Sequence, residues 1–266
     1  MAKGYLLNIH LNYVDKKAYL GWDGKLPDPN LDSKSFQERL YKDFEIFEQS
    51  NENATIQGVI TAFKELSNLA TSEDLVIITY SGHGAIDDSS SYAEDNFTSD
   101  QAWCLYDGLL KDNHIHLLLS LFKKGTRVVL FSFCCHSGSM YKSGVGQSVP
   151  ANWKPKFMPQ SIQQTKATEQ NSWIYILLQK LGCKQDIQCS LKYIGACQNN
   201  QYSYSTGVGD ASQLAWWESY NKNPKSPYVS IFNNISKLGL MRANQTPVYK
   251  NFSKDKIFNN EYAFKI

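Results

Sequence analysis

The sequence predicts an α/β/α sandwich built on a mainly parallel central sheet. Two short continuous apolar runs, at 75–80 and 128–131, are typical of strands that are buried on both faces of such a sheet. Strand-like and helix-like segments also alternate along the chain. With 266 residues, of which 42% are hydrophobic, the chain can bury a large core. We therefore expect a single domain over 1–266.

The N-terminal part supplies the first elements of this sandwich. Segment 5–14 is rich in Leu, Ile, Val and Tyr and predicts a first strand, which turns at 21–24 and 27–29 bring to an end. Apolar residues at helical spacing then predict two helices, over 36–47 and 56–69. Both helices have an apolar face that a sheet can cover.

Further elements follow in the same alternation. A helix from about His114 to Phe122 is expected between the two buried apolar runs. Another helix is expected near 173–181, then a strand at 191–196 and a fifth strand nearer the C-terminus. This order is that of a sheet with helices on both faces.

A polar segment at 139–171, rich in Ser, Gln, Pro, Lys and Gly, divides the chain into a larger part at 1–138 and a smaller part at 172–266. A polar stretch of this length inside a domain indicates a functional or mobile loop. Two interpretations of its lysines stay open: they keep the loop soluble, or they are self-cleavage sites. The lysines are Lys142, Lys154, Lys156 and Lys166.

Charge, apolar runs and cysteines exclude several classes of protein. The net charge is only +2 and no dense Lys/Arg run is present, so we expect no nucleic-acid partner. No secretory-signal pattern begins the chain, and no apolar stretch approaches the roughly 20 residues of a membrane span. The six cysteines form no CxxC pair, which favours free thiols over disulfides or zinc. We expect a cytoplasmic protein.

Two of the predicted strands end in sequences that can carry chemistry. His83 follows the first buried run within Ser-Gly-His-Gly, and Cys135 follows the second within Cys-Cys-His-Ser-Gly. Catalytic groups gather at the carboxyl ends of strands in open α/β sheets, so the two side chains meet if their strands are neighbours. The nearby glycines let backbone N–H groups approach a substrate carbonyl, as an oxyanion hole requires.

The spacing and context of these residues are similar to those of a known family. His83 precedes Cys135 by 52 residues, and the caspase histidine lies about 50 residues before its cysteine. The chain resembles the bacterial metacaspase-like branch of the caspase family, peptidase family C14, over nearly its whole length. The motifs that carry the resemblance are His10–Asn12, Gly21–Gly24, Tyr80–Gly84, Trp103–Gly108, Cys135–Gly138, Ala196–Gln201 and Gln245–Pro247.

This resemblance implies a caspase-like fold and a cysteine endopeptidase with roles for particular residues. Cys135, rather than Cys134, is the implied nucleophile, with His83 as its acid–base partner. The amides of Gly84 and Cys135 are the implied oxyanion donors. The substrate is another protein, and a monomer is expected by resemblance.

The implied substrate pocket departs from the family pattern. Metacaspases that cut after Arg or Lys carry an aspartate two residues before the nucleophile, where this chain has Phe133. A second acidic pocket position falls on Asp32, so we expect one carboxylate where two are usual. A basic residue before the cut bond remains the expectation, with less charge compensation beside Phe133.

The resemblance suggests calcium as a candidate cofactor, because many metacaspases use it. The segment from Asp87 to Asp100 offers oxygen ligands, but Lys142 stands where related calcium-binding enzymes carry an acid. We therefore expect no required metal, with a solvated acidic loop favoured over a calcium site.

Several other residues have a structural interpretation, and one rival function stays open. We expect His10 to be a hydrogen-bonded core histidine, His114 and His116 to face solvent or cap a helix, and Trp216 and Trp217 to lie in the core. The rival function is a catalytically silent caspase-like module that binds a partner through its cleft. Retention of a histidine and a cysteine at the two strand ends argues against this rival.

Overall fold

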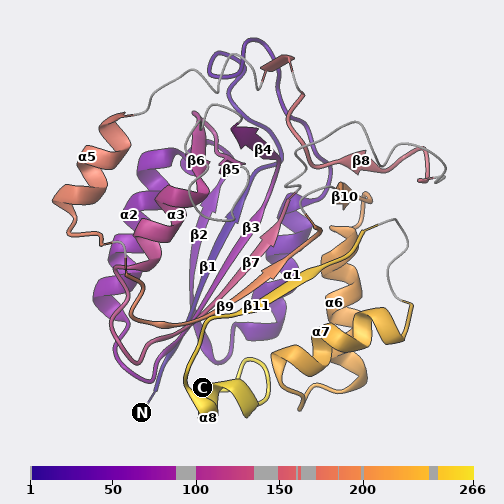
Figure 1. Ribbon diagram of the computed structural model, residues 1–266. Coiled ribbons are helices and arrows are strands. Elements are labelled where there is room, and N and C mark those ends of the chain that lie inside the picture. Colours follow the sequence, from indigo (N-terminus) through magenta and orange to yellow (C-terminus); the bar gives the residue numbers. More distant parts are fainter. Residues whose placement is uncertain are drawn as a thin grey trace.

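The computed structural model describes residues 2–87, 100–134, 149–159, 161–162, 172–184, 186–198, 201–239 and 245–266. Its centre is a six-stranded sheet with the order β11-β9-β7-β3-β1-β2, and only β11 runs antiparallel to its neighbour (Figure 1). The strands are β1 (Gly4–His10), β2 (Phe44–Ser50), β3 (Leu75–Ser81), β7 (Arg127–Phe133), β9 (Ser190–Gly195) and β11 (Val248–Asn251). Strands from before and after the polar segment thus share one sheet.

Helices cover both faces of this sheet, which confirms the predicted α/β class (Figure 1). One face carries α2 (Ile56–Leu69), α3 (Asp112–Leu119) and α5 (Ser172–Lys180). The other carries α1 (Pro29–Leu40), α6 (Ala211–Lys222), α7 (Tyr228–Lys237) and α8 (Lys256–Asn260). The helices α2, α3 and α5 and the strand β9 lie where the sequence predicts them.

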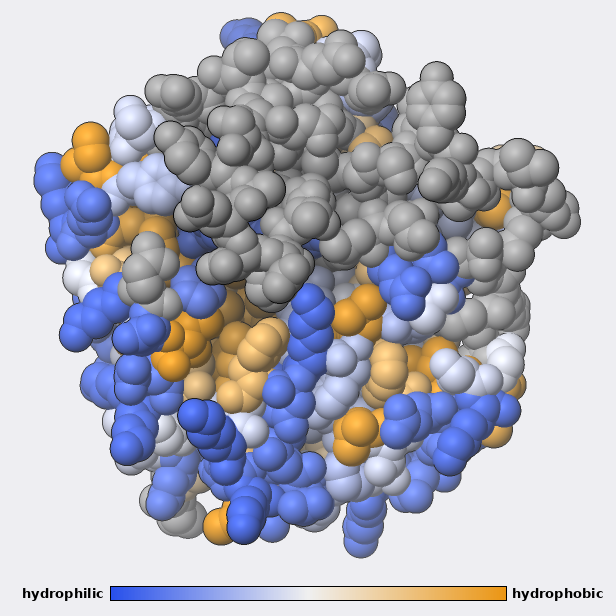
Figure 2. Space-filling model, in the orientation of Figure 1, coloured by the Kyte–Doolittle hydropathy of each residue, from blue (hydrophilic) through white to orange (hydrophobic). Residues whose placement is uncertain are grey.

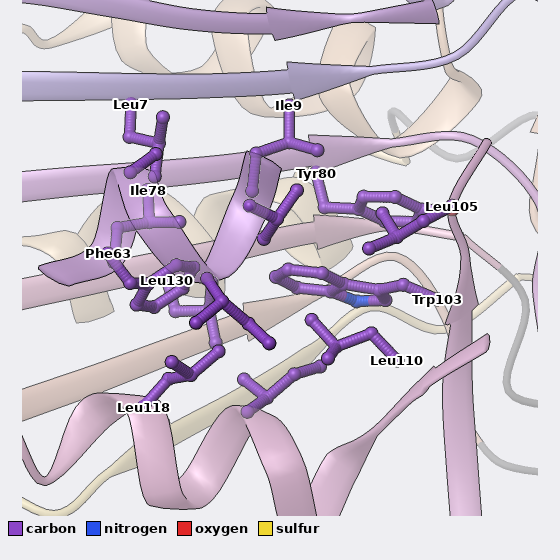
Figure 3. Close-up of a cluster of buried hydrophobic side chains, with 14 of the residues drawn as sticks. Leu7, Ile9, Phe63, Ile78, Tyr80, Trp103, Leu105, Leu110, Leu118 and Leu130 are labelled. Carbon is purple, nitrogen blue, oxygen red and sulfur yellow. The ribbon is translucent and has the colours of Figure 1, made fainter. Parts of the chain in front are cut away.

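Each face of the sheet packs on its own apolar core. Ile77 and Phe131 point into the core under α1 and α6. Ile78 and Leu130 point into the core under α2 and α3, where they gather with Phe63 and Trp103 (Figure 3). Because successive side chains of a strand alternate between faces, two covered faces require the continuous apolar runs seen in the sequence.

The predicted helix over 36–47 is wrong in its second half. The helix α1 ends at Leu40, and Phe44 and Phe47 belong to β2, which pairs in parallel with β1. Pro29 occupies the first turn of α1, where its missing N–H costs no helical hydrogen bond. The apolar residues fit a helical period by coincidence, and pairing along an open strand edge decides the structure.

Two small sheets lie beyond the carboxyl ends of the central strands (Figure 1). The first joins β4 (Gly84–Asp87), β5 (Asp100–Cys104) and β6 (Leu109–Lys111). The second pairs β8 (Lys154–Pro155) with β10 (Tyr204–Ser205) in antiparallel fashion. The sequence does not predict these sheets, and both border the site described below.

The described residues also bear on disulfides and membrane spans. Cys104, Cys134, Cys183, Cys189 and Cys197 are all free thiols. None of the helices in the described part of the chain combines the length and the apolar composition that crossing a bilayer requires.

Candidate active site

The strands that carry the predicted catalytic pair are direct neighbours. β3 and β7 pair in parallel, and their last residues, Ser81 and Phe133, are register partners. His83 follows Ser81 by two residues, just as Cys135 follows Phe133 by two. The condition set by the sequence, that the two strands adjoin, is therefore met. Cys135 itself lies outside the described residues.

The imidazole of His83 is held in one orientation. Its Nε2 lies 3.0 Å from the carbonyl oxygen of Gly24, and since a carbonyl only accepts, Nε2 carries the proton of the neutral ring. Trp22 packs edge-on against the ring with a centroid distance of 4.7 Å. Gly24 adopts a φ of +56°, a conformation that favours glycine. The predicted turn at 21–24 thus holds and shields the histidine.

The second ring nitrogen of His83 is the one available for proton transfer. Nδ1 is buried and has no hydrogen-bond partner within the described ranges of the chain. An unpaired basic nitrogen in a buried position is costly unless another group completes it. This nitrogen is the atom through which His83 can exchange a proton.

The backbone of His83 is fixed by an aromatic pair behind it, Tyr80 and Trp103. Tyr80 Oη donates to the carbonyl oxygen of His83 at 2.7 Å, and the amide of Cys104 donates to the same oxygen at 3.0 Å. The Tyr80 ring stacks on Trp103 with centroids 4.5 Å apart. The motif around Trp103 therefore supports the histidine from behind.

Burial keeps the His83 imidazole neutral. It lowers the pKa of His83 to about 3, and the positive charge of Lys156 acts in the same direction. The backbone groups of Gly24 and Phe157 oppose this shift without cancelling it. Near neutral pH the ring is therefore neutral, and its Nδ1 carries no proton.

Gly84, the predicted oxyanion donor, contacts a distant part of the chain. Its amide donates to the carbonyl oxygen of Lys156 at 2.9 Å, and its own carbonyl oxygen accepts from the amide of Met158 at 2.9 Å. The Gly84 N–H is thus directed at a peptide carbonyl, as an oxyanion donor must be.

Asp32 lies in a buried polar pocket at the same end of the sheet. It occupies the first turn of α1 and is 2% exposed. Its Oδ2 accepts from Ser81 Oγ at 2.5 Å and from Lys156 Nζ at 3.3 Å, and its Oδ1 accepts from the amide of Asp210 at 2.7 Å. The carboxylate is therefore held in place by three donors.

A second pocket carboxylate, Asp210, comes from a part of the chain that the sequence analysis did not single out. Asp210 caps α6, with Oδ1 accepting from the amide of Ser212 at 2.9 Å. Its Oδ2 lies 3.2 Å from Lys156 Nζ and accepts from Ser203 Oγ at 2.5 Å. An aspartate before a helix predicts an N-cap, but nothing local predicts a pocket.

A third carboxylate, Asp28, stands behind these two. It accepts from Ser205 Oγ and from the amides of Gly207 and Gly209. The expectation of a single pocket carboxylate is therefore wrong, because acids from the start of α1 and from the start of α6 converge here. We name the group Asp28, Asp32, Ser81 and Asp210 the acid pocket.

The ammonium of Lys156 fills the acid pocket. The side chain is fully buried, and burial alone opposes its charge, but Asp210 and Asp32 more than offset this and raise the pKa of Lys156. Burial raises the pKa of Asp32 to about 7, an effect that Lys156 only partly reverses. A lysine in this position does not keep a loop soluble, so that interpretation is wrong for Lys156. Lys154 is exposed, and Lys142 and Lys166 lie outside the described residues.

Phe133 does not line the acid pocket. It is 1% exposed and packs in the core against Phe36 and Phe131, with ring centroids 6.1 and 5.8 Å away. The reason is the alternation of β7, which turns residues 131 and 133 toward α1. The predicted contact of a substrate side chain with Phe133 is corrected accordingly.

Most of the structural interpretations of other residues are confirmed. His10 is buried and lies 2.9 Å from Glu48, and Trp216 and Trp217 lie in the core. His114 is buried rather than solvent-facing, and its Nδ1 accepts from the Lys111 amide at the start of α3. The motif residue Gln245 donates to the carbonyl oxygen of Ala196 and to Ser203 Oγ, which in turn donates to Asp210.

Most of the acidic segment that was considered as a calcium site, residues 88–99, lies outside the described residues, as does Lys142. In the part of the chain that the structure describes, no group of three or more His, Cys, Asp or Glu side chains could hold a metal ion. The expectation of a solvated acidic loop therefore stays a prediction.

Of two cavities lined by described residues, one borders His83. A cavity of about 450 Å³ is lined by His83, Trp22, Gly24 and Phe157 among others. A more apolar cavity of about 460 Å³ is lined by residues of α3, β7, β9 and β11 and contains none of the predicted site residues. On the face of the molecule that Figure 2 shows, apolar surface lies on both sides of a hydrophilic strip. The cavity beside His83 is therefore the candidate for the active site.

Comparison with known proteins agrees with this geometry. The family model for the metacaspase, peptidase C14 domain matches residues 31–143, which include Asp32, His83 and Cys135. The crystal structure of protein GSU0716 of Geobacter sulfurreducens, a structural genomics target, matches with a TM-score of 0.82 and 30% sequence identity, over 99% of each chain. No curated protein matches. The region 31–143, which contains the predicted catalytic motifs, is therefore similar to the metacaspase, peptidase C14 domain, and the whole chain shares its fold with the Geobacter protein.

Proposed function

We propose that this protein is a cysteine endopeptidase that cleaves other proteins, with Cys135 as nucleophile and His83 as acid–base partner. The observation that carries the proposal is the state of His83 at the end of β3. One ring nitrogen is fixed on Gly24, the other is unpaired among the described residues, and β3 pairs directly with β7, the strand that leads to Cys135. His10 and His114 also have one bonded and one unpaired ring nitrogen, so what sets His83 apart is its place after β3, whose neighbour β7 leads to Cys135.

The reaction follows from these roles. His83 Nδ1 takes the proton of the Cys135 thiol, and the sulfur attacks the carbonyl carbon of the substrate peptide bond. The amides of Gly84 and Cys135 stabilise the negative oxygen of the tetrahedral intermediate. The imidazolium then gives its proton to the leaving amine as the C–N bond breaks, which leaves a thioester on Cys135. Water hydrolyses this thioester, releasing the carboxyl product and restoring the thiol.

We propose further that the enzyme cuts after a basic residue. The acid pocket supports this, since Asp32 and Asp210 already surround a buried ammonium at 3.3 and 3.2 Å. Burying a cation is favourable only where carboxylates and further hydrogen-bond acceptors compensate for lost water. Ser81 Oγ supplies such an acceptor, at 2.8 Å.

A panel of fluorogenic peptides that differ only in the residue before the cut bond tests both parts. We expect the wild type to prefer lysine or arginine, and Cys135→Ala and His83→Ala to lose roughly a thousandfold or more in kcat, since the pair acts as a unit. Equal turnover by the three proteins would disprove the peptidase. A preference for acidic or apolar residues would disprove the basic preference alone.

We propose no resident metal and a monomeric protein in a reducing compartment such as the cytoplasm. The free thiols of the described cysteines support the compartment. The proposal of a partner-binding module without activity predicts instead that His83→Ala and the wild type are indistinguishable in every peptide assay.

A further inference from the structure

The segment Lys154–Met158 crosses the candidate active site as an extended strand. Its first two residues form β8, which pairs antiparallel with β10 through Lys154 with Ser205 and Pro155 with Tyr204. The amide of Lys156 then donates to the carbonyl oxygen of Ser203 at 2.9 Å. Adding a strand to an exposed sheet edge is a common way for a protein to bind an extended peptide.

On its other side the segment pairs with the strand that follows His83. The carbonyl oxygen of Lys156 accepts from Gly84, and the amide of Met158 donates back to Gly84. The carbonyl oxygen of Lys156 thus lies where the proposed mechanism places the carbonyl oxygen of a substrate. Phe157, the next residue, lines the cavity beside His83, and its ring contacts Tyr202 at a centroid distance of 5.7 Å.

The side chain of Lys156 completes the likeness to a bound substrate. Its ammonium contacts three groups of the acid pocket, Ser81 at 2.8 Å, Asp210 at 3.2 Å and Asp32 at 3.3 Å, and is closed off from solvent. The backbone of Lys156 therefore contacts the proposed oxyanion donor Gly84, and its side chain contacts the acid pocket. The proposed function assigns the same two contacts to a substrate with a basic residue before the cut bond.

We propose that Lys154–Met158 is an internal inhibitor that holds the substrate cleft in the manner of a substrate, with Lys156 in the primary pocket. The inference rests on the proposed function, since it uses the same pocket and the same oxyanion donor. A tethered segment competes at a high effective concentration, so protein substrates reach the cleft only when the segment leaves it. The cleft is thereby kept closed in the resting protein.

The contacts also identify the side chain that the pocket accepts best. One compact ammonium meets three acceptors from three different elements, β3, α1 and the start of α6. A planar guanidinium instead prefers paired acceptors on one carboxylate. The inhibitor therefore points to lysine, rather than arginine, as the preferred residue of protein substrates.

Steady-state kinetics with a short lysine peptide test the proposal. In Lys156→Gln the competing ammonium is gone, so we expect the apparent KM to fall by roughly tenfold or more relative to the uncut wild type, with kcat changed little. Intact mass establishes that the wild type is uncut. Lys124→Gln is the matched control, because Lys124 is an exposed lysine near the start of β7, at the opposite end of the strand. It should retain the wild-type KM.

Two further arms keep the test decisive if Lys156→Gln folds poorly. Phe157→Ala removes a half-buried ring from the segment and leaves the acid pocket intact, so its KM should also fall, by a smaller factor. A synthetic peptide with the sequence Trp153–Pro159 should compete with substrate in either variant, and the same peptide with glutamine for lysine should not.

The outcomes separate this inference from the function on which it rests. Equal KM values in the wild type, Lys156→Gln and Phe157→Ala, together with activity that depends on Cys135, would overturn the internal inhibitor and leave the peptidase intact. Absence of Cys135-dependent activity in every variant would overturn both.

Discussion

Lys156 and Lys192 are both fully buried, and their surroundings differ in kind. Lys156 lies among the acids and the hydroxyl of the acid pocket, at the end of the sheet that carries His83. Lys192, on β9, donates to the carbonyl oxygen of Phe258 and lies 3.6 Å from the centre of the Phe258 ring. The first environment is built for a cation, whereas the second tolerates one.

The protonation of the two lysines reflects this difference. Neighbouring carboxylates raise the pKa of Lys156, while burial lowers the pKa of Lys192 to about 8 despite the charge of Glu261. Asp32 and Asp210 are also held by backbone amides, so we expect the acid pocket to keep its shape when its cation leaves. Such preorganisation is what a binding pocket requires and a core does not.

The largest effect is expected from Asp32→Asn, which removes a carboxylate from the acid pocket. Breaking a buried ion pair costs about 3 kcal/mol, so the preference for a lysine peptide over the matching norleucine peptide should fall roughly a hundredfold. Both kcat/KM values are measured on the same variant. The internal segment competes equally with the two peptides, so its effect cancels in the ratio. Glu261→Gln, beside Lys192, should keep the wild-type ratio, and loss of the ratio there would contradict the comparison.

The second effect is on stability, measured by urea unfolding. Lys156→Met leaves buried carboxylates without their cation and should lower the free energy of unfolding by about 3 kcal/mol. Lys192→Met replaces a poorly compensated charge by an apolar chain of similar length and should change it by less than about 1 kcal/mol. Equal decreases in the free energy of unfolding in the two variants would show that the two lysines stabilise the fold equally, which would contradict the comparison.

The third effect is the dependence of stability on pH. Because the pKa of Lys192 is about 8 in the folded chain and about 10.4 in an unfolded one, the unfolded chain binds more protons between these values. Wild type should therefore gain stability over Lys192→Met as pH rises through this window, by at most about 1.4 kcal/mol per pH unit.

Lys156 should show the opposite sign, because its folded pKa is raised. Relative to Lys156→Met, the wild type should keep its full advantage up to about pH 10.4 and lose it only above that value. Urea unfolding at several pH values between 7.5 and 10.5 measures both differences. A gain for Lys156 in this window would contradict the assigned environment.

The smallest effect is expected from calcium. Since Lys142 replaces the acid that related calcium-binding enzymes carry, millimolar calcium should change kcat/KM by less than about twofold. The comparison is made on protein treated with a chelator, with magnesium as the control cation. A many-fold rise specific to calcium would show that the acidic segment at 87–100 binds it.

The sequence predicts the elements whose signal is local. The runs at 75–80 and 128–131 give β3 and β7 because burial on both faces leaves no room for polar residues, and the reactive sequences at their ends place His83. The acid pocket is different. Asp210 meets Asp32 across 178 residues of chain, and Lys156 meets Asp32 across 124. No local pattern encodes such contacts, so the second carboxylate and its lysine could only be found in the structure.

One labelling experiment tests the central claim, that His83 and Cys135 form a reactive pair beside an acid pocket. A lysine peptide with a thiol-reactive electrophile is added to the wild type, Lys156→Gln and His83→Ala, and the modified cysteine is identified by peptide mass mapping. The account predicts modification at Cys135, far faster than that of a free cysteine, fastest in Lys156→Gln and lost in His83→Ala. Modification spread over the other cysteines, or a rate at Cys135 no greater than that of free cysteine, would contradict it.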